Sequence, residues 1–100
     1  MMMIFLNAEA QTSAFKRIDS LIEIGRYKIA LEELKMKHNS FLTCLKKANI
    51  YNAIDNHEKA SAYYKKALDF KDDYKTRIKL GKSLQKEQNF VRQYWYLKRF

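Results

Sequence analysis

The chain has 100 residues, enough for one modest domain with a single hydrophobic core. No proline, only two glycines and 47% apolar residues argue against a strand-rich fold and a disordered chain, and favour an all-α domain. The net charge of +9 is concentrated in residues 41–100, which carry +8, whereas residues 1–40 carry +1. A basic half of this kind either attracts acidic peptides, nucleic acid or anionic lipid, or serves only as a solubilising surface.

The first eleven residues have two interpretations, and the sequence leaves both open. Met1–Leu6 is apolar, and Ala8-Glu9-Ala10 fits the small-x-small site that ends a secretory signal, although the basic start of such a signal is absent. Residues 1–11 are either a truncated signal peptide or an apolar N-terminal end. The first interpretation implies an exported or periplasmic protein, and the second a cytoplasmic one. No stretch has the roughly 20 apolar residues of a membrane span.

Two helices are expected in the first part of the helical domain, which we assign to residues 12–100. Apolar residues recur at helical spacing between about Gln11 and Ile24, and Gly25 ends this helix because glycine adopts the left-handed conformation that closes a helix. A second apolar stripe extends the next helix to about Lys37. The expected stripes consist of Phe15, Ile18, Leu21 and Ile22, with Ile24 as an optional member, and of Tyr27, Ala30, Leu31 and Leu34.

The third and fourth helices are predicted over Phe41–Ile54 and about His57–Phe70. Asn39 or Ser40 caps the third helix, and Asp55-Asn56 forms the turn that follows it. The expected buried side chains are Leu42, Leu45, Ala48 and Tyr51 in the third helix, and Ala60, Tyr63, Tyr64, Ala67 and Leu68 in the fourth. Cys44 is the only cysteine, so no internal disulfide forms, and its apolar neighbours indicate a small buried thiol.

The last part of the chain is predicted to form a third hairpin. Asp72-Asp73 caps a fifth helix that ends near Glu87, with Leu80, Gly81 and Leu84 on its inner face. Gln88-Asn89 is interpreted as a turn into a last helix, Phe90–Phe100. These elements give six helices in three hairpins.

An internal repeat organises these hairpins. The three turns, Gly25-Arg26-Tyr27, Asp55-Asn56-His57 and Gln88-Asn89-Phe90, are separated by 30 and 33 residues. In this spacing the chain resembles the tetratricopeptide repeat family, whose unit of paired helices has about 34 residues. The middle unit fits best, through Ala48, Tyr51, Ala60, Tyr64 and Ala67. Leu80-Gly81 fits in the third unit, but Gln93 replaces an expected alanine there and no proline closes any unit.

The resemblance implies three antiparallel hairpins stacked as a short right-handed α-solenoid, because one hairpin cannot bury its apolar face alone. It also implies a concave groove, lined by the first helix of each hairpin, that binds a peptide or another protein. The expected groove residues, which supply cations and amide groups for an acidic peptide, are Lys46, Asn49, Asn52, Lys75, Lys79, Lys82 and Lys86. The alternative is that the lysines form an ordinary solvated helix face.

The last predicted helix carries aromatic side chains on more than one of its faces. Repeat arrays normally end with a helix whose outer face is polar, and this chain has none. Part of its aromatic surface is therefore expected to mediate self-association or partner binding. The alternative is that the chain is a fragment of a longer protein, in which the next hairpin covers this surface. The residues of this expected terminal interface are Tyr94, Trp95, Tyr96 and Phe100.

The sequence thus favours a non-catalytic scaffold that mediates protein–protein interaction. One alternative is the sensory or regulatory part of a larger signalling protein. Another is nucleic-acid binding through the basic half, for which no recognised motif is present. No cofactor or metal site is expected, because His38 and His57 lie at helix boundaries without partners at catalytic or ligand spacing.

Overall fold

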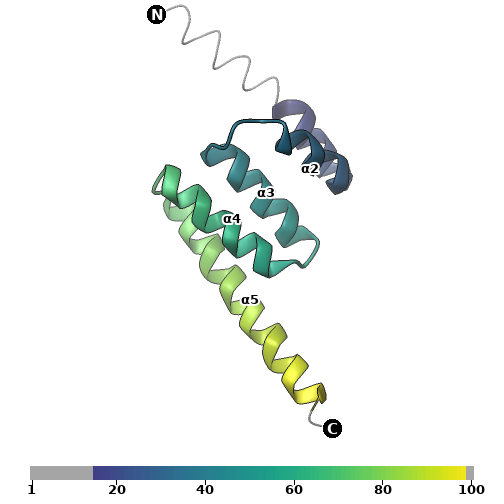
Figure 1. Cartoon of the computed structure of the whole chain (residues 1–100), viewed down its shortest axis with the longest axis vertical. Helices are drawn as coiled ribbons and strands as arrows, with labels where there is room; N and C mark the ends of the chain where they lie inside the picture. Colours follow the sequence, from purple (N-terminus) through teal and green to yellow (C-terminus); the bar gives the residue numbers. More distant parts are fainter. Residues whose placement is uncertain (1–14, 99–100) are drawn as a thin grey trace, which may run out of the picture. The chain divides into compact units, whose positions relative to one another are not determined.

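The computed structural model describes the backbone of residues 15–98 and the side chains of residues 15–89. The described chain is helical, without strands, which confirms the all-α class. Residues 15–23 are helical, and α2 (Tyr27–Lys35), α3 (Phe41–Ala53), α4 (His57–Phe70) and α5 (Tyr74–Lys98) follow (Figure 1). The chain divides into two compact units, residues 1–37 and 38–100. The prediction of one repeat domain over residues 12–100 stays a prediction.

In the first unit, the helical residues 15–23 and α2 form a hairpin. Ile18, Ala30 and Leu34 are fully buried, as their helical spacing predicts. The guanidinium Nε of Arg17 lies 2.8 Å from a carboxylate oxygen of Glu33, so an exposed ion pair also joins the two helices. Such a pair contributes little to stability, about 0–1 kcal/mol, and the buried apolar residues contribute more.

The turns that close this hairpin and the next one have the same geometry. Gly25 has φ +80° and Asp55 has φ +62°. At the first turn, Gly25 N–H donates to the Ile22 carbonyl and Arg26 N–H to the Leu21 carbonyl. At the second turn, the equivalent bonds run from Asp55 to Asn52 and from Asn56 to Tyr51. Both are Schellman motifs, 30 residues apart, so two of the three predicted turns are confirmed in position and in kind.

In the second unit, α3 and α4 form the hairpin whose bounds the sequence predicts within a residue. The Ser40 hydroxyl accepts the Thr43 N–H at 3.2 Å, and the Asn56 side chain accepts the Lys59 N–H at 3.3 Å, so each helix begins at a side-chain cap. The buried cluster between the helices consists of Ala48, Ala60 and Tyr64, with Leu45, Tyr51, Tyr63 and Leu80 packed against it. Small residues on facing helices leave room for one large aromatic ring.

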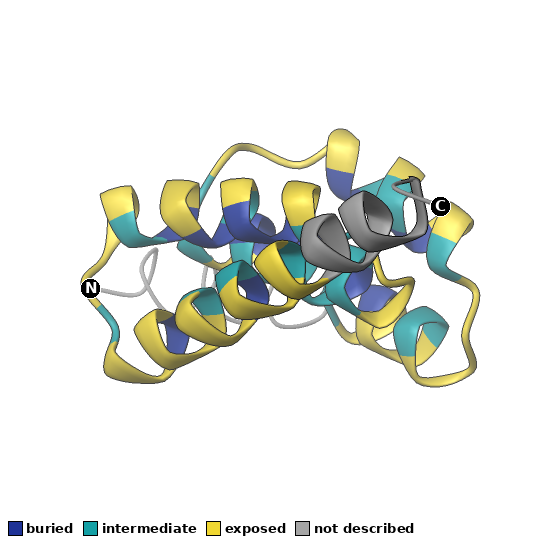
Figure 2. Cartoon of the chain, turned by 90° about the horizontal axis from the view of Figure 1, so that it is seen from below, coloured by how far each residue is buried: buried dark blue, intermediate teal, exposed yellow. Residues whose placement is uncertain are grey.

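Two expectations for α3 differ from the structure. Leu42, expected on the buried side, is 42% exposed, whereas Thr43 is buried. Thr43 is accommodated because its hydroxyl donates to the His38 carbonyl at 2.9 Å, so its burial leaves no unpaired donor. The expected buried thiol is confirmed, since Cys44 is free and 2% exposed. Along the helices, buried residues face inward and exposed ones outward (Figure 2).

The predicted turn at Gln88-Asn89 is wrong, because α5 continues through it to Lys98. At about 1.5 Å per residue, this helix is nearly twice as long as α4, and its C-terminal part projects past α4 (Figure 1). Gln88 favours a helix, and no residue there adopts the left-handed conformation found at Gly25 and Asp55. The third hairpin is therefore absent from the described chain, and the three-hairpin solenoid is not confirmed.

The face of α5 against α4 is more polar than predicted. Thr76 and Ser83 are buried on it, and Leu80, Leu84 and Glu87 are partly buried. The Ser61 hydroxyl of α4 lies 2.9 Å from the Glu58 carbonyl and 3.2 Å from a Glu87 carboxylate oxygen, and it donates to both. Gly81, expected on this inner face, is instead exposed. A Cβ built on Gly81 has no atom within 4 Å, so this glycine does not allow close packing of α4 and α5.

Candidate functional site

The lysine face of α5, made of Lys75, Lys79, Lys82 and Lys86, is the strongest candidate site in the described chain. All four residues are exposed. At about 100° per residue, they span a sector of about 60° on a continuous helix. The buried residues Thr76 and Ser83 lie about a quarter turn from the middle of this sector, so the lysines flank the buried face. Residues 74–98 carry seven basic residues and one acidic one, a net +6.

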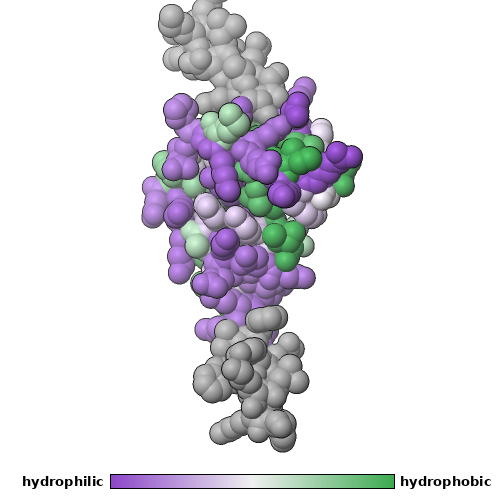
Figure 3. Space-filling model, turned by 45° about the vertical axis from the view of Figure 1, so that its right-hand side comes forward, coloured by the Kyte–Doolittle hydropathy of each residue, from purple (hydrophilic) through white to green (hydrophobic). Residues whose placement is uncertain are grey.

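None of these four lysines forms an ion pair with another described residue. The acidic group of α5, Glu87, already accepts the Ser61 hydroxyl. Hydrophilic side chains cover most of one face of the molecule, with apolar side chains in separate patches (Figure 3). Four like charges on three turns of helix repel one another, so an anion that binds there relieves repulsion and gains attraction.

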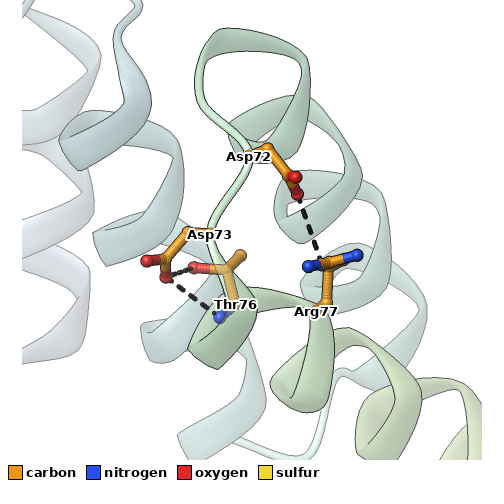
Figure 4. A network of polar contacts seen from close by, with 4 residues as sticks. All are labelled: Asp72, Asp73, Thr76 and Arg77. Atoms are coloured by element: carbon orange, nitrogen blue, oxygen red, sulfur yellow. Dashed lines mark hydrogen bonds and ion pairs between the residues drawn. The ribbon is translucent and has the colours of Figure 1, made fainter.

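The start of α5 is fixed by the two carboxylates that the sequence assigns to capping (Figure 4). A carboxylate oxygen of Asp73 accepts the Thr76 hydroxyl at 2.6 Å and the Thr76 N–H at 3.1 Å. The hydroxyl bond, the N–H bond and the charges of Lys71 and Lys75 together lower the pKa of the Asp73 carboxyl. Asp72 pairs with Arg77 across 3.3 Å. Asp73 is thus the cap, and the pair needs no catalytic role to explain it.

Two of the three expected groove residues of α3, Asn49 and Asn52, form contacts within the hairpin itself. The Asn49 side-chain oxygen accepts the Tyr64 hydroxyl at 2.7 Å, and the Asn52 oxygen lies 3.1 Å from Nδ1 of His57. Lys46 is partly buried. Because α4 packs against both α3 and α5, a groove lined jointly by the α3 residues and the α5 lysines stays a prediction. His57 lies next to the turn, with Nε2 3.6 Å from an Asp55 carboxylate oxygen, and serves the helix boundary.

The expected terminal interface cannot be located in the same way. Tyr94, Trp95 and Tyr96 belong to the C-terminal part of α5, and their side chains lie outside the described residues, as does Phe100. Its role in self-association or partner binding stays a prediction.

The sequence did not indicate a cluster of aromatic rings and lysines across α3 and α4. Tyr51 and Tyr63 stack with their centroids 5.5 Å apart and their planes 6° apart. The ammonium of Lys59 lies 5.3 Å from the Tyr51 centroid, and those of Lys47 and Lys66 lie 5.4 and 4.9 Å from the Tyr63 centroid. Each cation–ring contact is worth about 0.5–1 kcal/mol, so the cluster adds to the packing that holds α3 and α4 together. The contact of Lys66 with Tyr63 lies within α4 at a spacing of three residues, but the other contacts join α3 to α4 and depend on how the two helices pack.

The described residues contain no group of three or more His, Cys, Asp or Glu placed to hold a metal ion. Within residues 15–98, no helix combines the length and the apolar character needed to cross a bilayer. Comparison of the chain with models of protein families, with curated proteins and with solved structures gives no significant match.

Proposed function

We propose that this protein is a non-catalytic helical-repeat scaffold, of the tetratricopeptide kind, that binds an acidic segment of another protein. The repeat is supported by two Schellman turns with equivalent hydrogen bonds, 30 residues apart, each closing a helical hairpin. The site is the lysine face of α5. The observation that carries the proposal is that four exposed lysines share one helix face and have no ion pair among the described residues.

The arrangement favours several separate negative charges over a single anion. Lys75 and Lys86 are eleven residues apart, so the lysine face is about 17 Å long. An exposed ion pair contributes only about 0.2–1 kcal/mol, so a useful affinity requires several pairs at once. Asp and Glu residues spaced along a peptide satisfy this requirement. The interaction is expected to weaken with salt, because exposed charges are screened over about 8–10 Å at physiological ionic strength.

The test is titration of the full chain with an acidic peptide that ends in a free carboxylate. The site variant carries Lys75→Glu, Lys79→Glu and Lys82→Glu. The matched control carries Lys28→Glu, Lys35→Glu and Lys37→Glu, which make the same change of net charge on exposed positions of the first unit. Binding should be lost in the site variant and weakened only slightly in the control.

Two results would contradict the proposal. Equal binding by the site variant and the wild type would show that the lysines are a solvated face. Equal loss in both variants would show that only net charge matters. A parallel titration with oligothymidylate tests the nucleic-acid alternative, which the net +6 of α5 favours, through a steep fall of affinity with salt.

A further inference from the structure

The side of α5 that faces away from α4 carries exposed apolar side chains. Tyr74 is 71% exposed and Ile78 is 41% exposed. Together with Gly81 they lie within about 60° of one another around the helix, roughly opposite the buried face of Thr76 and Ser83. The same sector also holds the exposed Gln85. We call Tyr74, Ile78 and Gly81 the outer stripe, which leaves this polar residue out. An amphipathic helix normally buries its apolar residues, so this second stripe is not explained by contact with α4.

Gly81 is the unusual member of the outer stripe. It lies in the interior of a helix, where glycine is less favourable than alanine by about 1 kcal/mol. It adopts no positive φ, and a Cβ at this position would have nothing within 4 Å. Neither conformation nor packing against the described residues therefore requires a glycine there. Glycine in a helix lets another backbone approach closely, and a partner on the outer stripe would use that property.

The charges beside the outer stripe differ between its two borders. On one border lies the lysine face. On the other lies Arg77, whose guanidinium pairs with Asp72 and lies 5.9 Å from the Tyr74 ring centroid. Among the described side chains of α5, the available positive charge is therefore on the lysine side of the outer stripe. An occupant with acidic residues along one flank complements this pattern.

We propose that the partner of this protein binds as an amphipathic helix that docks along α5, with its apolar side on the outer stripe, its acidic flank on the lysine face and its closest approach at Gly81. This inference rests on the proposed function and specifies the binding element. A second copy of the chain is a poor occupant, because each copy carries a net +9 and brings the same lysines to the contact.

The experiment uses two synthetic peptides of identical composition, each roughly four helical turns long. One places leucines at i, i+4 and i+7 with glutamates along one flank, and the other has the same residues in scrambled order. Both are titrated into the full-length wild type and into Gly81→Ala. The control variant is Ser20→Ala, at an exposed helical position of the first unit. Melting temperatures are measured for all three proteins.

The expected result is a change of opposite sign in two measurements. Gly81→Ala should melt at a higher temperature than the wild type, because alanine favours the helix and its methyl group meets open space. It should bind the helical peptide about fivefold or more weakly, because the methyl group blocks close approach of the two backbones. Ser20→Ala should also be stabilised, but should bind as the wild type does. The scrambled peptide should bind weakly to all three.

Other outcomes separate the two proposals. If Gly81→Ala binds the helical peptide as tightly as the wild type, or if the two peptides bind equally, helix docking at Gly81 is overturned while acidic-segment binding stands. If neither peptide binds the wild type, docking and the proposed function both fail.

Discussion

The hydrogen bond between Tyr64 and Asn49 is expected to be the most stabilising single polar contact of the α3–α4 hairpin. Tyr64 is 1% exposed, and its hydroxyl donates to the Asn49 side-chain oxygen at 2.7 Å. Tyr64→Phe removes the donor without opening a large cavity and should cost about 1 kcal/mol. Asn49→Ala leaves a buried hydroxyl without its acceptor and should cost about 1–3 kcal/mol, less about 0.5 kcal/mol that alanine returns through helix propensity.

A double-mutant cycle measures the coupling. The double variant loses the same bond only once, so its free energy of unfolding should fall by about 1 kcal/mol less than the sum of the single losses. Urea denaturation followed by circular dichroism gives these values, and each kcal/mol corresponds to about 4–8 °C in melting temperature for a chain of this size. Additive losses, or two single losses below about 0.3 kcal/mol, would refute the hydrogen bond as a source of stability.

The same residue predicts a dependence on alkaline pH. Burial raises the pKa of the Tyr64 hydroxyl above its ordinary value near 10. The stability linked to its proton is therefore fully present below pH 10 or so and is lost as the pH rises through the folded-state pKa. Tyr64→Phe should lose less stability than the wild type over that range. An identical decline in both proteins would contradict this reasoning.

The remaining predictions concern the turn and the cap. Asp55 has φ +62°, so Asp55→Gly should raise the free energy of unfolding by about 0.5–1 kcal/mol. In the same urea titration, Gly25→Ala should lower the free energy of unfolding by about 1 kcal/mol or more, because Gly25 has φ +80°. Equal and small effects of the two substitutions would argue against left-handed strain at both turns. The lowered pKa of Asp73 means that its capping contribution is present above pH 4 or so and is lost as the pH falls through the folded-state pKa. Asp73→Asn should remove the part of the acid-induced loss of helix that comes from protonation of Asp73, as measured by the helical circular dichroism signal between pH 5 and 2 or so. An acid transition of the variant that equals that of the wild type would contradict this prediction.

The accuracy of the sequence-based predictions follows from how local their physical causes are. Gly25, Ser40 and Asn56 determine turns and caps through their own backbone and side chains, and the structure confirms each of them. The turn predicted at Gln88-Asn89 is wrong because no residue there ends the helix, and α5 continues to Lys98. Burial was predicted from polarity, which fails for Thr43 because its hydroxyl finds an acceptor within the chain.

For the candidate site, too, the sequence predicts the features that depend on one helix and misses those that depend on contacts between helices. Lysine spacing on one helix predicts a shared face directly, and α5 being a continuous helix makes that face contiguous. The roles of Asn49 and Asn52 depend on contacts with Tyr64 and His57, which lie across a turn. The stacking of Tyr51 on Tyr63 likewise depends on the register of two helices. Sequence patterns indicate which residues share a face of a helix, but neither which face is buried nor which neighbour each residue contacts.

The polar contact between α4 and α5 has a consequence for how the protein opens. The buried Ser83 hydroxyl has no hydrogen-bond partner among the described residues, and Ser61 shares its proton between a carbonyl and Glu87. If α5 moves away from α4, the Ser83 and Ser61 hydroxyls bond to water. Separating α5 from α4 therefore costs less free energy than separating α3 from α4, which would expose Tyr64. The helix that carries the lysine face is thus also the helix that the second unit releases most easily. Its position relative to α4 then becomes a variable that binding to α5 can bias.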